Sequence, residues 1–285
     1  MNTLLDNSVL IDNIENKTFE EGIILDLSFF ERCKNVDMQT KITRINEIKD
    51  YVSKTNSTIL SISGKDIFDL NIDCVNNLLI EVSNYLGFQF IMFCQLIALF
   101  YIYKINKISI VDGCYFGNKE VCFFLNSIIN SNETMSQFYS NIGNEIYNNP
   151  SNFNKIKYEK NYVNLILDYY NSKVKSGIEI NNLSSISPTI MKKEIDKNVS
   201  EHEIDLFVFN VFRFRKDSVN NSKVFSAYLK NFYVNNNKFE FNNIVDMCTI
   251  YTAITHNLKL ATKDARLINI KKFLDFDVED RRQGR

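Results

Sequence analysis

The chain has 285 residues, of which 45% are hydrophobic and 24% are charged, a composition typical of a globular protein and not of a disordered one. Its formal net charge of −1 excludes a global basic field that would attract nucleic acid, so any such contact has to come from a local patch. Six cysteines without a Cys-x-x-Cys pair, together with only two histidines, argue against a structural zinc site. We expect buried thiols in a reducing cytoplasm.

Taken in chain order, the predicted elements alternate between strands and helices. Strand-like apolar runs occur at 23–25, 58–62, 108–111, 121–124 and 258–261. Helical periodicity marks 42–52, 75–85, 162–170, 204–214 and 224–232. Strands that alternate with helices predict an α/β fold with a central, mostly parallel sheet and helices on its faces.

The segment 86–103 carries no charged residue and has nearly the length of a bilayer-spanning helix. Basic residues flank it on one side only, at Lys104 and Lys107, which is a weak topology signal for a membrane protein. We therefore expect a helix buried inside an α/β domain rather than a membrane span. The first sixteen residues lack the basic and apolar regions of a signal peptide, which also favours a cytoplasmic protein.

The most informative stretch lies near the C-terminal end of the chain. Asn242 or Asn243 is expected to cap a helix that carries Asp246 in its first turn. Asn257 tolerates the left-handed conformation that closes such a helix. A short strand then delivers Asp264 at its carboxyl end, where open α/β sheets place their chemistry. Two carboxylates at one edge of a sheet predict a site for Mg²⁺ or Mn²⁺.

This stretch resembles the C-terminal half of a PIN-domain ribonuclease, whose motif runs from an Asp through an apolar helix to His-Asn-Leu-x-Leu-x-Thr-x-Asp. The matching positions are Asp246, Thr252, Ala253, His256, Asn257, Leu258, Leu260, Thr262 and Asp264. The resemblance implies a PIN-like three-layer α/β sandwich with a largely helical insertion. It also implies that Asp246 and Asp264 are metal ligands, and that Thr262 orients a metal-bound water or a phosphate oxygen.

The resemblance further implies two acids upstream of this stretch. Glu194 follows Pro188 and an apolar turn, as the second acid of the family does. The first acid has two candidates, because Asp26 matches better by residue type and Asp112 matches better by its distance to Glu194. Asp26, followed by Ser28, is slightly preferred.

The choice of first acid decides the expected domain organisation. With Asp26, the chain is a single PIN-like domain over 1–285 with an insertion at about 65–180. With Asp112, an accessory segment at 1–105 precedes a PIN-like domain at 106–285. Either arrangement places Asp26 or Asp112, Glu194, Asp246 and Asp264 around the metal.

A PIN-like protein with these acids is expected to be an Mg²⁺- or Mn²⁺-dependent endoribonuclease, similar to toxin-type PIN proteins. Its substrate would be RNA, with DNA as an alternative, and its partner would be an antitoxin or another protein. Lysines and arginines adjoin the proposed acids and would neutralise a phosphate backbone. The alternative left open is a PIN-like scaffold that has lost catalytic acids and binds a protein partner.

Overall fold

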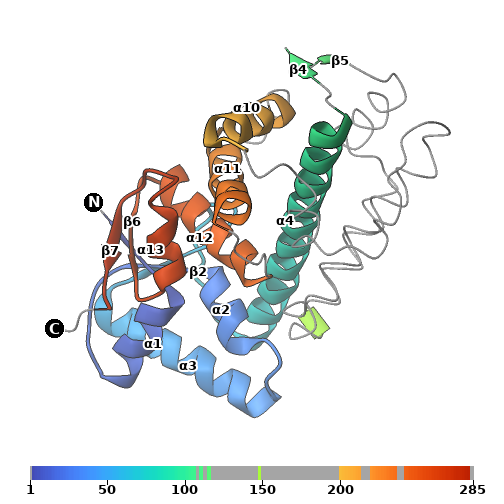
Figure 1. Ribbon diagram of the computed structural model, residues 1–285. Coiled ribbons are helices and arrows are strands. Elements are labelled where there is room, and N and C mark those ends of the chain that lie inside the picture. Colours follow the sequence, from blue (N-terminus) through green and yellow to red (C-terminus); the bar gives the residue numbers. More distant parts are fainter. Residues whose placement is uncertain are drawn as a thin grey trace. The chain divides into compact units, whose positions relative to one another are not determined.

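The computed structural model describes residues 2–106, 109–111, 114–116, 147–148, 199–212, 219–235 and 241–282. The chain forms two compact units (Figure 1), and each is described by itself. Unit 1 comprises Met1–Leu86, Ile142–Pro150 and Ile244–Arg285, and unit 2 comprises Gly87–Asn141 and Ser151–Asn243. The second unit thus interrupts the first, further along the chain than the insertion expected at 65–180.

Unit 1 is built on a five-stranded sheet with the order β3-β2-β1-β6-β7, in which all neighbours are parallel. The strands are β1 (Thr3–Leu5), β2 (Ile23–Leu25), β3 (Thr58–Leu60), β6 (Lys259–Thr262) and β7 (Val278–Asp280). The central strand β1 pairs with β2 on one side and with β6 on the other. The expected α/β class with a parallel sheet is therefore confirmed, although β1 and β7 were not among the predicted strands.

Helices connect these strands, and side chains of the expected types define their ends. Their bounds are α1 (Asn7–Glu15), α2 (Asp26–Cys33), α3 (Met38–Thr55), α4 (Ile72–Asn106), α12 (Asn242–Thr255) and α13 (Ala265–Ile270). Asp6, Asp37 and Asp264 cap α1, α3 and α13 by accepting backbone N–H hydrogen bonds. Asn56 and Asn257 follow α3 and α12 with φ of 55° and 51°, as left-handed residues that end helices do.

The direction of the connections places the helices on the two faces of the sheet. The chain moves from β1 to β2 and β3 in one direction, and from β3 to β6 and β7 in the other. Right-handed crossovers then put α1, α2 and α3 on one face and α12 and α13 on the opposite face. Contacts among α1, α2 and α3 agree with a shared layer. This arrangement is compatible with a three-layer α/β sandwich.

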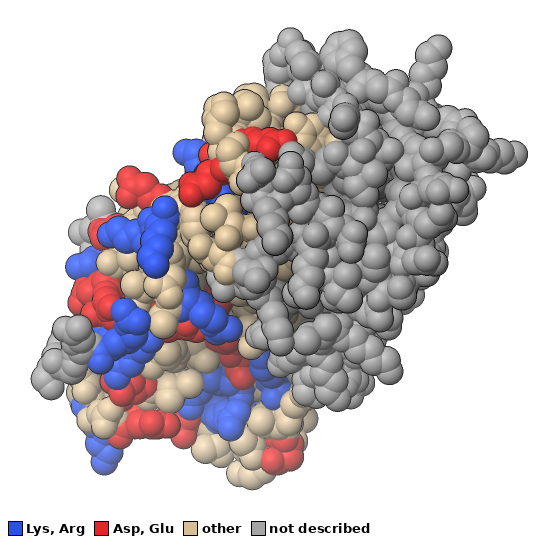
Figure 2. All heavy atoms as spheres, viewed as in Figure 1, with Lys and Arg blue, Asp and Glu red and all other residues tan. Residues whose placement is uncertain are grey.

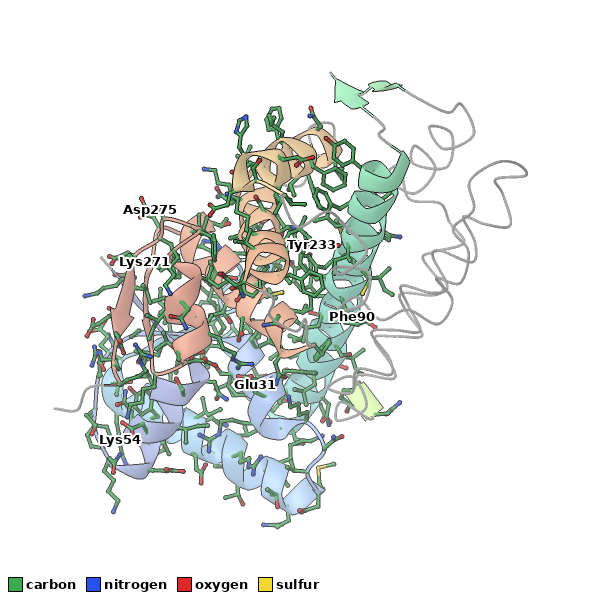
Figure 3. The ribbon with its side chains drawn as sticks, viewed as in Figure 1. Glu31, Lys54, Phe90, Tyr233, Lys271 and Asp275 are labelled. Carbon is green, nitrogen blue, oxygen red and sulfur yellow. The ribbon has the colours of Figure 1, made fainter. Side chains whose placement is uncertain are left out.

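Unit 2 is helical in most of its described residues. It contains the second part of α4, together with α10 (Glu201–Phe212), α11 (Val219–Val234) and the antiparallel pair β4 (Ser109–Val111) and β5 (Cys114–Phe116). Its core is aromatic. Phe93 of α4 stacks on Phe225 with ring centroids 5.6 Å apart, and Phe100 lies 5.0 Å from Tyr233. Figure 3 labels Phe90 on α4 and Tyr233 on α11.

Helix α4 contains the apolar segment that raised the question of a membrane span. The stretch Ile72–Ile97 is long and apolar enough to cross a membrane. An 18-residue window within it has a mean hydropathy of 1.2, and 72% of that window is buried. A core helix of a soluble protein has the same length and composition. Phe90, Phe93 and Phe100 are completely enclosed, as expected for a buried helix.

A candidate acidic site at the carboxyl edge of the sheet

The strand order creates a switch point between β1 and β6, because the connections leave these two strands in opposite directions. Ligands of open α/β sheets bind in the crevice outside the carboxyl ends of two such strands. Asp6 directly follows β1, and Asp264 comes two residues after the end of β6. Topology alone therefore brings acids from the two ends of the sequence to the place where this class of sheet binds ligands.

The carboxylate of Asp6 is held by hydroxyl groups from two elements. Ser8 Oγ donates to Asp6 Oδ2 at 2.5 Å, and Thr262 Oγ1 donates to the same oxygen at 2.9 Å. Thr262 is completely buried, and its hydroxyl also accepts a hydrogen bond from the backbone N–H of Asp264 at 2.9 Å. Thr262 thus links the Asp6 carboxylate to the backbone of Asp264, and its implied role toward a water or a phosphate oxygen stays a prediction.

Asp246 is the most enclosed acid of the site. Helix α12 begins at Asn242 itself, so Asp246 lies one turn inside the helix rather than in its first turn. Its side chain is 9% exposed, and its Oδ2 accepts no hydrogen bond from any residue that the structure describes. Burial raises the pKa of Asp246 well above its ordinary value, the charge of Arg266 opposes this rise, and Asp264, Asp6 and Glu31 add to it.

Asp264 differs from Asp246 because an arginine neutralises it directly. Arg266 Nη2 lies 2.6 Å from Asp264 Oδ2, and Nε lies 3.2 Å from both carboxylate oxygens. Burial by itself would raise the pKa of Asp264, but the hydrogen bonds and the charge of Arg266 outweigh burial and hold the pKa below its ordinary value. The same guanidinium is 3.8 Å from Asp246 Oδ2, so it lies between the two acids.

Glu31 of α2, labelled in Figure 3, is the fourth acid of this site. Burial raises its pKa to about 7 and the charge of Asp6 contributes to the rise, while Lys34, a hydrogen bond with Asn7 and the charge of Arg266 act in the opposite direction. Glu31 also contributes to the raised pKa of Asp246. Asp6, Glu31, Asp246 and Asp264 therefore form one electrostatically coupled group, and the charge of Arg266 acts on Glu31, Asp246 and Asp264.

Two members of this group, Asp6 and Glu31, were not among the residues selected from the sequence. The signal for Asp6 was nevertheless present. Leu4, Leu5 and Asp6 are followed by Asn, Ser and two further apolar residues, which is the pattern of a strand ending in Asp-x-Ser that was sought at Asp26 and Asp112. Glu31 had no comparable local signal.

Asp26 lies at the start of α2. Burial raises the pKa of the Cys248 thiol on α12, and the charges of Asp26 and Asp246 add to this rise. The Oδ1 of Asp26 accepts no hydrogen bond from any described residue. Its Oδ2 accepts a hydrogen bond from the backbone N–H of Ile62 at 2.9 Å, in the loop after β3. Burial raises its pKa to about 7, backbone hydrogen bonds from Ile62 and Leu27 oppose the rise, and the charge of Glu81 adds to it. The hydrogen bond of Asp26 thus stabilises the loop after β3. The other two predicted acids, Asp112 and Glu194, lie outside the described residues.

The donor chemistry of the coupled group fits a hard divalent cation. The group offers only carboxylate oxygens, the ligands that Mg²⁺ and Mn²⁺ prefer. Asp246 contributes a buried oxygen that no described residue satisfies, and so does the neighbouring Asn7 with its Oδ1. Among the described residues, no three His, Cys, Asp or Glu side chains stand at metal-ligand spacing. Binding a cation would thus require these carboxylates to move closer together.

Basic residues near the site are mixed with acids. Lys263, one of the cations expected around Asp264, pairs with Asp12 at 2.7 Å. Figure 2 shows Lys and Arg interspersed with Asp and Glu over the described surface that faces the viewer. The lysines around Glu194 lie outside the described residues. Among the residues that the structure describes, Arg266 is therefore the basic side chain with the closest contacts to the acids of this site.

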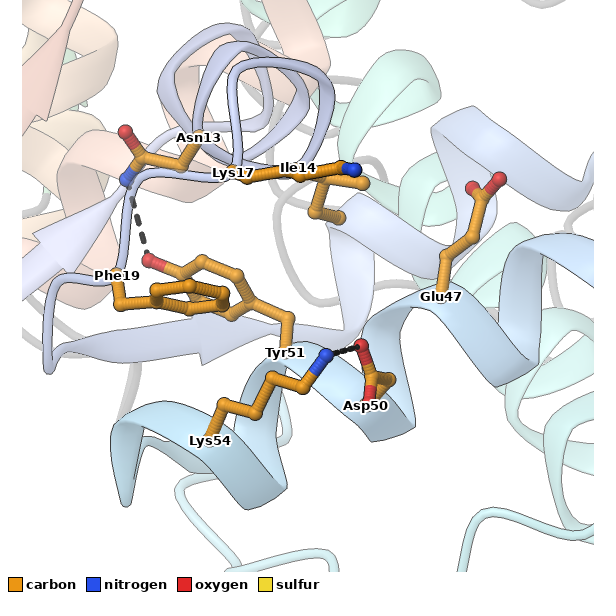
Figure 4. A pocket seen from close by; sticks show the side chains of 8 residues that line it. All are labelled: Asn13, Ile14, Lys17, Phe19, Glu47, Asp50, Tyr51 and Lys54. Atoms are coloured by element: carbon orange, nitrogen blue, oxygen red, sulfur yellow. Dashed lines mark hydrogen bonds and ion pairs between the residues drawn. The ribbon is translucent and has the colours of Figure 1, made fainter.

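Unit 1 also has an open pocket of about 360 Å³ between α1 and α3 (Figure 4). It lies at the C-terminal end of α1, whereas Asp6 caps the N-terminal end of the same helix. Four of its polar side chains pair with one another: Lys54 contacts Asp50 at 2.6 Å, and Asn13 donates to the Tyr51 hydroxyl at 3.1 Å. The pocket is thus separate from the acidic group and has none of its unsatisfied oxygens.

Comparisons with known proteins do not identify the chain. No family model matches it, and no curated protein or solved structure does. The class that the fold and the site define is an α/β protein with a parallel sheet and an acidic group at the carboxyl ends of its central strands.

Proposed function

We propose that the protein is an Mg²⁺- or Mn²⁺-dependent nuclease that hydrolyses phosphodiester bonds, most simply an endoribonuclease of the PIN-like type. The observation that carries this proposal is the convergence of Asp6, Glu31, Asp246 and Asp264 at the switch point of the sheet. One of these acids, Asp246, is buried with an oxygen that lacks a hydrogen bond from any described residue. An enclosed acidic group at this position is suited to binding a cation.

In this proposal Asp6, Asp246 and Asp264 hold the cation, and Glu31 adjoins it. A bound Mg²⁺ or Mn²⁺ would supply Lewis acidity for the phosphoryl oxygen and lower the pKa of water. Ser8 and Thr262 keep the Asp6 carboxylate in one orientation through the hydrogen bonds described above. These hydrogen bonds fix Asp6 in advance, whereas cation binding requires the other carboxylates to approach it.

In this scheme Glu31 is the general base that accepts the proton of the attacking water. Asn7 hydrogen bonds to its carboxylate, which orients the group next to the cation ligands. As the water oxygen forms its bond to phosphorus, the bond between phosphorus and the leaving 3′ oxygen breaks. The water proton passes to Glu31, and the leaving oxygen takes a proton from solvent. Asp26 has no step in this scheme, because its hydrogen bond is made with the loop after β3.

A non-catalytic scaffold is the second candidate, and Arg266 is the observation that favours it. The bidentate contact with Asp264 and the proximity to Asp246 already neutralise part of the acidic charge. In a scaffold these acids would serve only to fix α12 and α13 at the sheet. Such a protein would neither bind the cation tightly nor lose a function when an acid is removed.

The two candidates are separated by Mn²⁺-dependent cleavage of labelled single-stranded RNA and, in parallel, of single-stranded DNA. The wild type is compared with Asp246→Asn and with the control Asp280→Asn. Asp280 is an acid at the carboxyl end of the edge strand β7 and pairs with Arg282 at 2.6 Å. We expect cleavage by the wild type and the control, and none by Asp246→Asn, with circular dichroism spectra unchanged.

Cleavage by Asp246→Asn at the wild-type rate would refute the assignment of the site. A folded wild type that cleaves neither nucleic acid and gains no thermal stability from Mn²⁺ would support the scaffold instead.

A further inference from the structure

Arg266 is placed differently from an ordinary surface arginine. Its backbone N–H donates to Asp264 Oδ1 at 2.7 Å, and its guanidinium donates to Oδ2 of the same carboxylate. The guanidinium also lies 3.8 Å from Asp246 Oδ2. Its charge also lowers the pKa of Glu31. A single guanidinium thus contacts two acids of the proposed cation site and acts on a third through its charge.

The chain contains a second arginine with the same local contacts and a different setting. Arg282 grips Asp280 through Nε at 2.9 Å and Nη2 at 2.6 Å, and its backbone N–H donates to the same carboxylate at 3.0 Å. The side chains of Arg266 and Arg282 are similarly exposed, at 47% and 43%. The local Asp-x-Arg fork is therefore shared, and the further acids are a feature of Arg266.

We propose that Arg266 is a built-in counter-ion of the acidic site, which competes with the divalent cation for Asp264 and Asp246 and, once displaced, binds the phosphate of the substrate. This inference rests on the proposed function. Without a cation, Arg266 stabilises carboxylates that would otherwise repel one another. A divalent cation that enters the site has to displace the fork from Asp264, so the arginine lowers the affinity for the cation.

The second role follows from the chemistry of the fork and from its exposure. A planar guanidinium binds carboxylate and phosphate in the same bidentate manner. Nearly half of the Arg266 side chain is exposed, so solvent and a substrate phosphate can reach its guanidinium. The displaced charge then lies beside the site into which a phosphodiester must enter to reach the cation.

The test measures binding of Mn²⁺ by electron paramagnetic resonance of the free ion, for the wild type, Arg266→Gln and the control Arg282→Gln. A partly exposed ion pair limits affinity modestly, so we expect Arg266→Gln to bind Mn²⁺ about fivefold more tightly than the wild type. The control should match the wild type. Arg266→Lys, which keeps the charge and loses the fork, should lie between the two.

A second measurement addresses the phosphate. Binding of a labelled single-stranded RNA is followed by fluorescence anisotropy with Ca²⁺ in place of Mn²⁺. We expect Arg266→Gln to bind this RNA about fivefold more weakly than the wild type, because a charge-assisted contact is lost. A merely structural role would not produce tighter metal binding together with weaker RNA binding.

The outcomes are distinguishable. Equal or weaker Mn²⁺ binding by Arg266→Gln, with the wild type binding the ion, overturns the counter-ion role alone. Tighter Mn²⁺ binding with unchanged RNA binding overturns the phosphate role. If none of the proteins binds Mn²⁺, the proposed nuclease function fails, and this inference fails with it.

Discussion

Replacing Glu31 with glutamine should stabilise the metal-free protein at alkaline pH and not at acid pH. Glutamine keeps the shape of the side chain and a group that can bond to Asn7, but it removes the ionisation that burial and Asp6 make unfavourable. A carboxyl whose pKa is raised in the folded state favours folding while it is protonated. That contribution is complete below the unfolded pKa of about 4.5 and is lost as pH rises through the folded pKa.

The size of the effect follows from the pKa of Glu31, which rises from 4.5 to about 7. Each pKa unit corresponds to about 1.4 kcal/mol, so ionised Glu31 lowers the free energy of unfolding by up to about 3 kcal/mol above pH 7. We therefore expect Glu31→Gln to raise the free energy of unfolding at pH 8 by about 2 to 3 kcal/mol. The gain should be below about 1 kcal/mol at pH 5, where the folded wild type is mostly protonated.

The assay is urea unfolding followed by circular dichroism in EDTA at pH 5 and pH 8, for the wild type, Glu31→Gln and the control Glu21→Gln. Glu21 is an exposed acid outside the helices, so the control should change little at either pH. An equal gain for Glu31→Gln at both pH values, or no gain at pH 8, would refute the reasoning. Ionisation of Glu31 would then not be opposed by desolvation and by the charge of Asp6.

Two further substitutions separate Asp26 from the acidic site. Asp26→Asn keeps an acceptor for the Ile62 N–H and removes a carboxyl whose pKa rises from 3.8 to about 7 in the folded protein. In thermal unfolding at pH 8, the variant should be more stable than the wild type by up to about 4 kcal/mol. Its RNA cleavage should be unchanged. Loss of cleavage by Asp26→Asn would show that Asp26 belongs to the catalytic group. Thr262→Val should lower the cleavage rate at least about tenfold, because Asp6 loses the donor that orients its carboxylate. The free energy of unfolding should fall by about 1 to 3 kcal/mol, because the N–H of Asp264 also loses its acceptor. Cleavage kinetics with saturating Mn²⁺ would check this, and an unchanged rate would show that the orientation of Asp6 is not important for the reaction.

The C-terminal part of unit 1 was predictable because local sequence determines it. The apolar periodicity of α12, the left-handed Asn257 and the short strand β6 follow one another without help from distant residues. Asn257 has the expected positive φ, and the backbone N–H of Leu258 donates to the carbonyl of Ala253 at 2.8 Å. Such 6→1 bonds are how helices of this kind end.

The first strand was missed for a physical reason. Strand β1 contains three residues, as the predicted strand β2 does, so its length alone does not explain the miss. A strand between two parallel neighbours reads as a short apolar run without alternation, and Leu4 and Leu5 are the only two apolar residues of β1. Its position in the sheet comes from tertiary pairing with β2 and β6. The Asp-x-Ser pattern at Asp6 was therefore missed, because the pattern was sought only at the ends of recognisable strands.

The choice between Asp26 and Glu31 depends on the rotation of a helix. Helix α2 begins at Asp26 directly after β2, which directs the first residue toward the loop after β3. Glu31 comes five residues later, about 140° around the helix axis. Which of the two acids faces the site is set by how α2 packs on the sheet, and residue types alone do not contain that information.

The hydrogen bond between Asp6 and Thr262 joins residues 256 positions apart in the chain, and this separation has a consequence for biosynthesis. A ribosome releases Asp6 and Glu31 long before it has made α12 and β6. Until the last strands emerge, β1 has no partner on one side and the acidic group has only two of its members. Contacts of such high sequence separation also form slowly. Under the proposed function, the protein would therefore stay inactive during translation, and a chain that stops short of β6 would lack the complete acidic group.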